Sequence, residues 1–497
     1  MYERMHLLNK EDFNKLHDAT MEILTDIGIA FHEAEAIEIF KQSGVKTDGN
    51  IVYLEEQDVR HALDSAPSQF QIKARNPEKS VTIGGDHLVI APGYGTAFMV
   101  GPNGDRRDAV MEDYDNFCKL VHTSKYIDMN GCLMVEPSDI PPDIVHLNMI
   151  FSNIVLCDKP FLGSPVSRQA AIDSIEMAGI VWGNEKIKKE PVMMAIISTA
   201  SPLQYAAEMA GAIIEYARNG QALMIGGLML AGGTGPVTLP GLIALHNAEI
   251  LGGITLAQMV NPGVPVVYGT TSSIIEMKTG SLSVGAPELS IIQNATIQMA
   301  KYYGLSARGT GGVTDAHFPD IQAGIESAVS LTMTVLSGVN FILHACGILS
   351  SYLAMSYVKF LADEELCGML RRIIQPLNVT DERINLNAIK EVGIGGEYLS
   401  HDSTFDNCRK EFYMPRLMNR LNYASWLATD KKRFEETSTA SLSQRLAYYE
   451  KPDIDLGIER DLASFVARRK SEYLEHKSTH FQYEHSQVLP TSEDSDT

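Results

Sequence analysis

The stretch KYYGLSARGTGGVTDAHFPDIQAG, residues 301–324, indicates the fold of this chain most directly. It reads as the end of one helix, a short strand, a glycine-rich turn and the start of another helix. The turn holds Arg308, Asp315 and His317, together with glycines that let the backbone approach a ligand closely. Charged residues just beyond the carboxyl end of a strand are typical of sites in α/β enzymes. The rest of the chain should therefore supply a barrel or a sheet around this turn.

Apolar, strand-like segments recur along the chain on both sides of that turn. They begin near residues 87, 128, 159, 191, 222, 265, 304 and 341. Most intervals hold a helix with recognisable ends, such as those expected to begin at Ser167, Pro287 and Pro319. Strands alternating with helices over roughly 280 residues predict an α/β fold of the (β/α)8 TIM-barrel type. An open doubly wound sheet with extra strands is the alternative.

The predicted barrel covers residues 87–375 and has an extension at each end. Residues 1–86 are expected to form helices and a small sheet beside the barrel. Residues 376–475 are expected to form a helical extension. Residues 476–497 are polar and are expected to form a disordered tail or an extended arm.

Composition narrows the class of protein. The chain has 497 residues, 45% of them hydrophobic and 21% charged, which is typical of a soluble globular protein. A net charge of −21 argues against a nucleic-acid or anionic-membrane partner, since both require basic surface. No apolar run approaches the roughly 20 residues of a membrane span, and the N-terminus lacks signal-peptide features. Six widely spaced cysteines favour reduced thiols, so we expect a cytoplasmic protein.

Side chains with useful chemistry follow several of the predicted strands and would converge on one mouth of the barrel. They are Tyr94, Glu136, Ser198, Thr234, Tyr268, Arg308, Asp315, His317 and His344. Arg308 is the hardest to explain structurally, because a guanidinium at a glycine-flanked strand end needs an anion from the protein or from a substrate. The chain lacks a Walker loop, a dinucleotide fingerprint and the common metal-ligand motifs, so no metal site is expected.

Each of these candidates also has a structural interpretation. His344 could be a core histidine, and Tyr94 and Tyr268 could simply fill the barrel. Asp315 could cap a helix. Glu249, on the helix after Pro240, could be a solvated or locally paired carboxylate.

The chain resembles the trimethylamine methyltransferase superfamily of corrinoid-protein methyltransferases over nearly its whole length. The matching blocks are KLHDATMEILTDIGI at 15–29, SPLQYA at 201–206, LIALHNAEILGGITLAQ at 242–258, VPVVYGTTSS at 264–273, GAPELSIIQNATIQMAKYYGL at 285–305, DAHFPDIQAG at 315–324 and VGIGGEYL at 392–399. The resemblance implies a barrel that moves a methyl group from a methylated amine to the cobalt of a separate corrinoid protein. It also implies a role in methylamine metabolism, methanogenesis or acetogenesis.

One departure from the family pattern bears on the substrate. Trimethylamine enzymes of the family carry pyrrolysine just before the Asp-Ala that resembles Asp315-Ala316, and here that position holds Thr314. The electrophilic imine of pyrrolysine engages the lone pair of a tertiary amine, which a quaternary ammonium lacks. The resemblance therefore implies a non-pyrrolysine member that acts on a quaternary amine, with glycine betaine as the first choice. Proline betaine, carnitine or another betaine is the alternative.

These considerations assign expected roles to ten residues. Asp315, His317 and Glu249 are expected to be catalytic, whereas Tyr94, Tyr268, Arg308, Thr314, His344, Phe341 and Tyr352 are expected to bind substrate. Aromatic faces suit the cation, and Arg308, His317 or His344 would pair with the carboxylate of a betaine.

The expected partners are a cognate corrinoid protein, which presents the corrinoid (cobalamin), a small quaternary amine and further copies of the chain in a homo-oligomer. No cofactor is expected to be tightly bound. A metal-dependent lyase and a non-catalytic quaternary-ammonium binding protein remain the alternative functions.

Overall fold

In the computed structural model, a sheet of seven parallel strands forms the centre of the molecule, in the order β6-β18-β17-β14-β12-β10-β9. The structure describes residues 4–429 and 431–486, without the side chains of residues 474 and 476–486. The strands are β6 (Val89–Ile90), β9 (Phe161–Gly163), β10 (Met193–Ser198), β12 (Ala222–Gly227), β14 (Val266–Thr270), β17 (Ser306–Thr310) and β18 (Phe341–Leu343).

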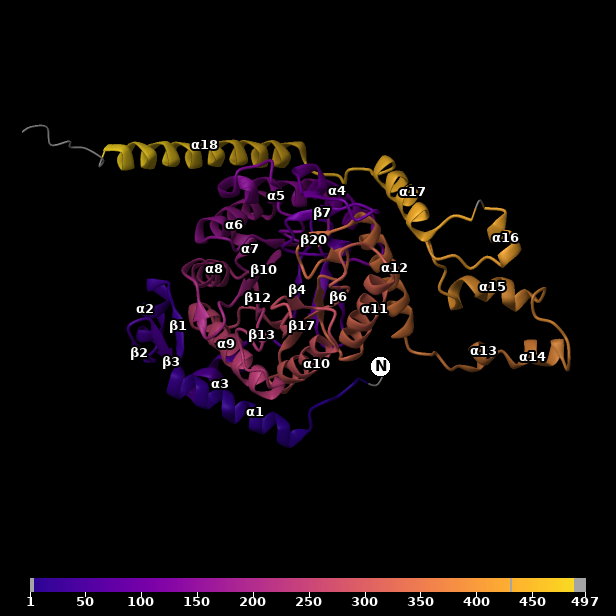
Figure 1. Ribbon diagram of the computed structural model, residues 1–497, viewed down its shortest axis with the longest axis horizontal. Coiled ribbons are helices and arrows are strands. Elements are labelled where there is room, and N and C mark those ends of the chain that lie inside the picture. Colours follow the sequence, from indigo (N-terminus) through magenta and orange to yellow (C-terminus); the bar gives the residue numbers. More distant parts are fainter. Residues whose placement is uncertain (1–3, 430, 487–497) are drawn as a thin grey trace, which may run out of the picture.

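Residues 128–130 close this sheet into a barrel. The backbone N–H of Asp128 donates to the carbonyl of Ile90 at 2.8 Å, and that of Leu162 donates to the carbonyl of Asn130 at 3.2 Å. The two edge strands, β6 and β9, are thereby joined through this segment. The predicted (β/α)8 barrel is confirmed, with seven regular strands and one bridging segment in place of the eighth (Figure 1).

A helix follows each strand and the bridging segment, and together the helices surround the barrel (Figure 1). In chain order they are α4 (Met111–Thr123), α5 (Pro142–Leu156), α6 (Arg168–Trp182) with the short α7 (Asn184–Ile187), α8 (Ala207–Arg218), α9 (Leu239–Val260), α10 (Pro287–Tyr302), α11 (Ile321–Leu336) and α12 (Tyr357–Ile373). Ser167 caps α6 as predicted, because its hydroxyl accepts the N–H of Ala170 at 3.0 Å. α11 begins two residues later than expected, because the Asp320 carboxylate caps it instead by accepting the N–H of Ala323.

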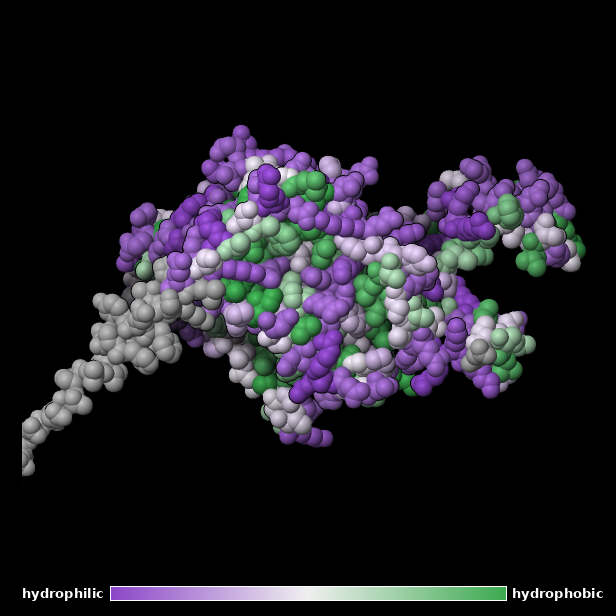
Figure 2. Space-filling model, turned by 90° about the horizontal axis from the view of Figure 1, so that it is seen from above, coloured by the Kyte–Doolittle hydropathy of each residue, from purple (hydrophilic) through white to green (hydrophobic). Residues whose placement is uncertain are grey.

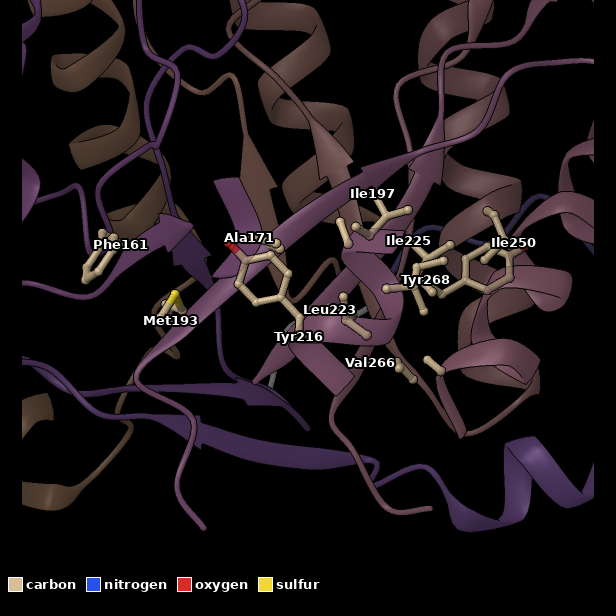
Figure 3. Packing of buried hydrophobic residues seen from close by; sticks show 14 of the residues in the cluster. Phe161, Ala171, Met193, Ile197, Tyr216, Leu223, Ile225, Ile250, Val266 and Tyr268 are labelled. Carbon is tan, nitrogen blue, oxygen red and sulfur yellow. The ribbon is translucent and has the colours of Figure 1, made fainter. Parts of the chain in front are cut away.

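Successive strand residues alternate between two hydrophobic layers. In β10, Met194 and Ile196 belong to the cluster that fills the barrel, whereas Met193 and Ile197 pack against the helices. Figure 3 shows part of this outer layer, with Ile197, Leu223 and Val266 on neighbouring strands. Both faces of the strands are buried, which explains why their sequences lack a clear alternation of apolar and polar residues.

The N-terminal region covers the barrel in several pieces. α1 (Lys10–Glu22) is capped by Asn9 and leads into the π-helical turn η1 (Ile23–Ile27), and α2 (Ala34–Gln42) and α3 (Glu56–Ser65) follow. The hairpin β4 (Gln69–Ile72) and β5 (Val81–Gly84), joined by η2 (Pro77–Lys79), contributes Ile72 and Ile83 to the barrel interior. Ser306, the first residue of β17, donates to the carbonyl of Ser68, so the hairpin lies at the amino ends of the strands. It therefore plugs the end of the barrel opposite the predicted site.

The single small sheet expected beside the barrel is instead divided among several. β1 (Ile29–Phe31), β2 (Lys46–Asp48) and β3 (Ile51–Tyr53) pair with β11 (Gln204–Tyr205), and β7 (Phe98–Val100) and β8 (Arg106–Asp108) pair with β19 (Ile348–Leu349) and β20 (Ala354–Met355). β13 (Leu230–Ala231), β15 (Ser273–Ile275) and β16 (Leu282–Ser283) form a further sheet. The short strands do not form one sheet, because β1 also pairs with β11 and β7 also pairs with β20, far away in the sequence, which local pattern does not reveal.

By length and composition one helix in the described part of the chain, α9, could cross a membrane, which the sequence scan overlooked. In the structure 78% of its apolar window is buried inside the protein. Its apolar character therefore reflects its place against the barrel.

The C-terminal region contains the expected helices. They are α13 (Asp381–Ile384), α14 (Leu386–Val392), α15 (Asp402–Glu411), α16 (Tyr423–Leu427), α17 (Phe434–Ala447) and α18 (Leu456–Ser486). α17 and α18 pack on the barrel helices, whereas α13 to α16 project from it (Figure 1). The tail expected from residue 476 is helical as far as Ser486, because α18 continues through it, and residues 487–497 lie outside the described residues.

Candidate active site

Arg308 is the central charged group of the barrel. Its side chain belongs to the set of alternate β17 residues that face the barrel interior, and it is 1% exposed. The neighbouring residue on β14, Gly269, leaves room for it, since a Cβ there would lie 3.0 Å from Cδ of Arg308. Nη2 lies 3.3 Å from Nδ1 of His344, and the buried Nε has no hydrogen-bond partner. In the described part of the chain no carboxylate pairs with Arg308. Burial lowers the pKa of Arg308 to about 10, which leaves it a cation at neutral pH.

His344 lies against this guanidinium as a neutral imidazole. Its Nδ1 is 3.1 Å from the hydroxyl of Thr310 as well as 3.3 Å from Arg308. Burial, and then the positive charge of Arg308, hold the pKa of His344 well below its ordinary value. Because an arginine always donates, Nδ1 acts as the acceptor and the ring proton belongs on Nε2. His344 is therefore a polar surface of the site and not a second cation.

Two tyrosines border the same place. The ring of Tyr352 lies 4.7 Å from that of His344, and its hydroxyl is 2.5 Å from the hydroxyl of Thr271. The ring of Tyr94, from the segment after β6, meets His344 edge-on at 6.3 Å. Burial raises the pKa of both phenols, so both stay neutral. The site thus combines one unpaired cation with three electron-rich rings.

The segment that carries His344 and Tyr352 has an unusual backbone. His344, Ser350, Ser351 and Tyr352 all have positive φ, between 51° and 74°. Such conformations are costly for residues other than glycine and cluster at functional sites. The strained segment turns the ring of Tyr352 back toward His344, a proximity that sequence spacing does not predict.

Several residues at the carboxyl end of the barrel are exposed. Ser198, the last residue of β10, is on the face of the strand that lines the barrel interior, and it is exposed. Its neighbour Ile197, on the outer face, is fully buried. Leu228, just after β12, is 38% exposed, and Glu136 is exposed at the rim. Solvent therefore reaches the carboxyl ends of β10 and β12, whereas Arg308 on β17 is buried. Thr234 lies farther out, where its hydroxyl accepts the N–H of Leu230.

Asp315, expected to be catalytic, is engaged in bracing the mouth. Its carboxylate accepts the hydroxyls of Ser283 and Ser351, at 2.6 and 2.7 Å, and the backbone N–H groups of Val284 and Gly285. These four bonds join the segment before α10 to the strained segment after β18. The geometry favours a positioning role for Asp315 in place of a direct one.

The two neighbours of Asp315 in the sequence motif also differ from expectation. Thr314 is fully buried, and its hydroxyl donates to Oε2 of Glu326 at 2.5 Å, so its side chain faces α11 and not a substrate. His317 is exposed, with Nδ1 3.0 Å from the hydroxyl of Ser350. His317 lies at the rim, away from Arg308's contacts.

Tyr268 and Glu249 point away from the site. The side chain of Tyr268 lies on the outer face of β14 (Figure 3). Its hydroxyl donates to Asn247 of α9 at 2.7 Å. The Glu249 carboxylate is buried and accepts the hydroxyls of Thr199 and Ser201 and the N–H of Leu203, which fixes the segment after β10. Neither side chain therefore lies beside Arg308: Tyr268 packs between β14 and α9, and Glu249 is engaged by the segment after β10.

Phe341 does face the barrel interior, directly beside Arg308 in the register of β17 and β18. It is 0% exposed and packs within the interior cluster. It therefore forms the barrel wall beside Arg308, and the rings that border the mouth are those of Tyr94, His344 and Tyr352.

A buried ion pair on α12, which sequence reasoning missed, holds the mouth segments from below. Lys359 donates to the carbonyl of Gly312 at 3.0 Å and to Asp363 at 2.5 Å, and Asp363 accepts the N–H of Gly347 at 2.8 Å. Gly312 must be glycine, since it has φ 64° and a Cβ would meet the carbonyl of Ala345 at 2.1 Å. A lysine and an aspartate four residues apart, on a helix face that is otherwise apolar, were the signal in the sequence.

One group in the described part of the chain has ligand types suited to a metal ion, namely His122, Cys157 and Asp158. It lies just before β9 and so at the opposite end of the barrel. Lys79 Nζ is 2.6 Å from the Asp158 carboxylate and His122 Nδ1 is 3.0 Å from it, so this carboxylate already has partners within the protein, one of them the Lys79 ammonium group. These three possible metal ligands therefore lie away from the candidate site at the mouth of the barrel.

Fold and site together define an α/β-barrel enzyme with its site at the carboxyl ends of the strands. The family model described as trimethylamine methyltransferase (MTTB) matches residues 1–473. The chain is 42% identical to a glycine betaine methyltransferase of Desulfitobacterium hafniense (strain Y51), over 94% of this chain and 98% of that protein. It is 30% identical to a proline betaine:corrinoid methyltransferase of Eubacterium limosum, over 90% and 94%.

Among solved structures, the monomethylamine methyltransferase MtmB of Methanosarcina barkeri matches with a TM-score of 0.51 at 11% identity, covering 90% of each chain. That likeness concerns the fold alone. The sequence comparisons extend over the whole barrel and both extensions. The chain belongs to the trimethylamine methyltransferase family, and it is a methyltransferase.

Proposed function

We propose that this enzyme removes a methyl group from a betaine, with glycine betaine as the preferred substrate, and transfers it to the Co(I) corrinoid of a separate protein. The observation that carries this proposal is the buried, unpaired guanidinium of Arg308. An uncompensated buried charge is expensive, and a carboxylate that arrives with the substrate would compensate it. Trimethylamine has no carboxylate, so it would leave Arg308 unpaired.

The other end of a betaine fits the same mouth. A quaternary ammonium prefers the faces of aromatic rings, each worth roughly 0.5–2 kcal/mol. Tyr94 and Tyr352 flank His344, which burial keeps neutral, so no second cation repels the ammonium group. The 42% identity to a glycine betaine methyltransferase supports this choice among betaines.

The reaction needs little acid–base chemistry. In the proposed displacement the methyl carbon forms a bond to cobalt while the carbon–nitrogen bond breaks, and its electron pair stays on nitrogen. The leaving group is a neutral tertiary amine, which needs no proton in the transition state. This accords with carboxylates, Asp315 and Glu249, that are used to hold loops in place.

Positioning is then the main contribution of the protein. Arg308 would fix the carboxylate deep in the barrel, so that the methyl groups on nitrogen point outward to the solvent-accessible mouth. The exposed rim, with Ser198, Leu228 and Glu136, would be the side from which the corrinoid protein approaches. We place the enzyme in the cytoplasm, where its corrinoid partner would be kept reduced.

The test is direct. The enzyme is incubated with cob(I)alamin and, in separate reactions, glycine betaine, proline betaine, carnitine and trimethylamine, and the absorbance of methylcobalamin is followed. The proposal expects the fastest formation with glycine betaine and none with trimethylamine. Transfer from trimethylamine but from no betaine would overturn it, and calorimetric binding of a betaine without any methyl transfer would favour a non-catalytic binding protein instead.

A further inference from the structure

The projecting segment of residues 375–433, here called the arm, has almost no core of its own. It includes α13 to α16, and among its described residues Ala388 is the one that is buried. Large apolar side chains are exposed all along it, among them Leu377 at 81%, Ile394 at 109% and Leu399 at 86%. Folded chains seldom leave so much apolar surface uncovered without a partner.

Aromatic residues make up a large part of this surface. Phe405 is 81% exposed, Phe412 65% and Tyr423 72%. Since a buried aromatic side chain removes about 150–250 Å² from water, these three alone offer on the order of 300 Å² of surface to a partner. Together with the aliphatic residues, the arm approaches the roughly 800 Å² that each partner contributes to a stable interface.

The body of the same chain presents an uncovered apolar surface on the side from which the arm projects. On α11, Ile321, Ile325 and Val329 form one stripe at helical spacing and are 82%, 59% and 48% exposed. The stripe borders a cavity of about 1200 Å³ between α11, α12 and α17. Phe318, 44% exposed, lines the same cavity. We call this stripe with its cavity the α11 surface.

The figures place the two surfaces on one side of the molecule. In Figure 1, α13 to α16 extend beyond α11 and α12, on the side opposite α8 and α9. In Figure 2 the two projecting lobes at the right carry hydrophobic patches and leave open space between one another. An arm and an acceptor surface on the same side suit a two-fold arrangement, in which each copy gives its arm and receives the other.

Charge favours a second copy as the occupant. The arm contains nine Lys or Arg and eight Asp or Glu, a net charge of +1, whereas the whole chain carries −21 and the remainder therefore −22. Two acidic bodies repel each other, and a nearly neutral arm is the part of the chain that approaches another body at the lowest electrostatic cost. The arm also leaves the barrel from the end of α12, so it does not occupy the mouth that the proposed function reserves for a corrinoid protein.

From these observations we infer that the arm of one copy packs on the α11 surface of a second copy, reciprocally, and that this exchange forms the interface of a homo-oligomer. The inference concerns assembly and stands independently of the substrate. It deepens the expectation of an oligomer by assigning the two surfaces that meet.

Sedimentation of the full-length chain tests the interface. Three variants place a charge on it, Phe405→Glu on the arm and Ile321→Glu and Ile325→Glu on α11, and Leu456→Glu is the matched control, since Leu456 of α18 is 81% exposed and Ile321 82%. We expect the parent and the control to sediment as an assembly, and each of the three variants to weaken self-association by roughly tenfold or more. A monomeric parent chain, or variants that assemble as the parent does, would overturn the inference.

A cross-linking experiment identifies which surfaces meet and does not depend on loss of assembly. In a Cys408→Ser background, which removes the partly exposed native thiol, one preparation carries Phe405→Cys and a second carries Ile325→Cys. After mixing, subunit exchange and mild oxidation with diamide, a disulfide should join an arm cysteine of one copy to an α11 cysteine of the other. Cross-links from the arm to Leu456→Cys in equal yield would refute the exchange, because they would show no preference for the α11 surface. If Phe405→Glu lost binding to the corrinoid protein while its assembly mass stayed that of the parent, the arm would be assigned to that partner instead.

Discussion

Replacing Arg308 by methionine should make the enzyme more stable and less able to bind betaine at the same time. Burial lowers the pKa of Arg308 to about 10 from an ordinary value of 12.5. The folded state thus holds this proton less tightly than the unfolded state, so the charge destabilises the fold at every pH below about 10. At neutral pH the cost is of the order of 3 kcal/mol, since each unit of pKa corresponds to about 1.4 kcal/mol. Methionine fills similar volume without a charge, so Arg308→Met should recover part of this free energy.

The same change removes the proposed partner of the betaine carboxylate. Two charge-assisted hydrogen bonds, at roughly 1.5–3 kcal/mol each, would be lost, which predicts a fall in affinity of about 10² to 10⁴-fold. Tetramethylammonium has no carboxylate, so its affinity should change little. Calorimetric titration with glycine betaine and with tetramethylammonium, together with the urea midpoint of unfolding, measures both effects.

The surface change Arg60→Met is the control, because Arg60 is 67% exposed and should leave both quantities nearly unaltered. The reasoning about Arg308 would be refuted by an Arg308→Met variant that unfolds at lower urea concentration and still binds betaine as the parent does. Equal losses for betaine and tetramethylammonium would also contradict it, because they would indicate a general collapse of the site.

Substitutions at four other residues should have distinguishable effects. Tyr352→Ala should weaken betaine binding by roughly 3- to 30-fold through the lost cation–π contact, whereas Tyr352→Phe should keep most of it, as calorimetry can show. Tyr268→Phe should cost about 1 kcal/mol of stability in urea unfolding and leave the KM for betaine unchanged, since its hydroxyl bonds behind the barrel wall. Asp315→Ala should lower kcat more than Asp315→Asn does, because asparagine keeps one oxygen acceptor for the four donors of the mouth, and stopped-flow methyl transfer distinguishes the two. Burial raises the pKa of Asp363 to about 6 from 3.8, so this carboxyl holds its proton more tightly in the folded state. Its contribution to stability therefore falls as pH rises from about 4 to about 6. In Asp363→Asn the urea midpoint of unfolding should depend less on pH over that range.

The repeat of apolar segments was enough to predict the barrel, because the same pattern recurs along the whole chain. Strands buried on both faces need apolar residues throughout, and each crossover needs a helix with a start and an end, so both signals are local. The bridging segment at 128–130 was predicted as a strand on the same grounds, although three-dimensional closure leaves it only bridge contacts. Arg308 could also be identified from the sequence alone, because a charged residue in a glycine-flanked strand has few structural explanations.

The direction of individual side chains could not be predicted in this way. In β14 both faces are buried, so nothing in VVYGT shows whether Tyr268 faces the barrel or the helices. The carboxylates of Asp315 and Glu249 looked catalytic in a one-dimensional motif, but donors from distant segments satisfy them. These contacts exist only once the loops have been brought together.

By itself the sequence determined the barrel, its family and a cation at the end of one strand, because periodicity, helix ends and residue types are properties of neighbouring positions. Tertiary structure alone decided which rings surround that cation, which carboxylates are occupied in holding loops, and that an apolar arm and an apolar helix face are uncovered on the same side of the molecule. The physical reason is that hydrogen bonds and burial depend on partners far away in the chain, and only the folded arrangement brings those partners into contact.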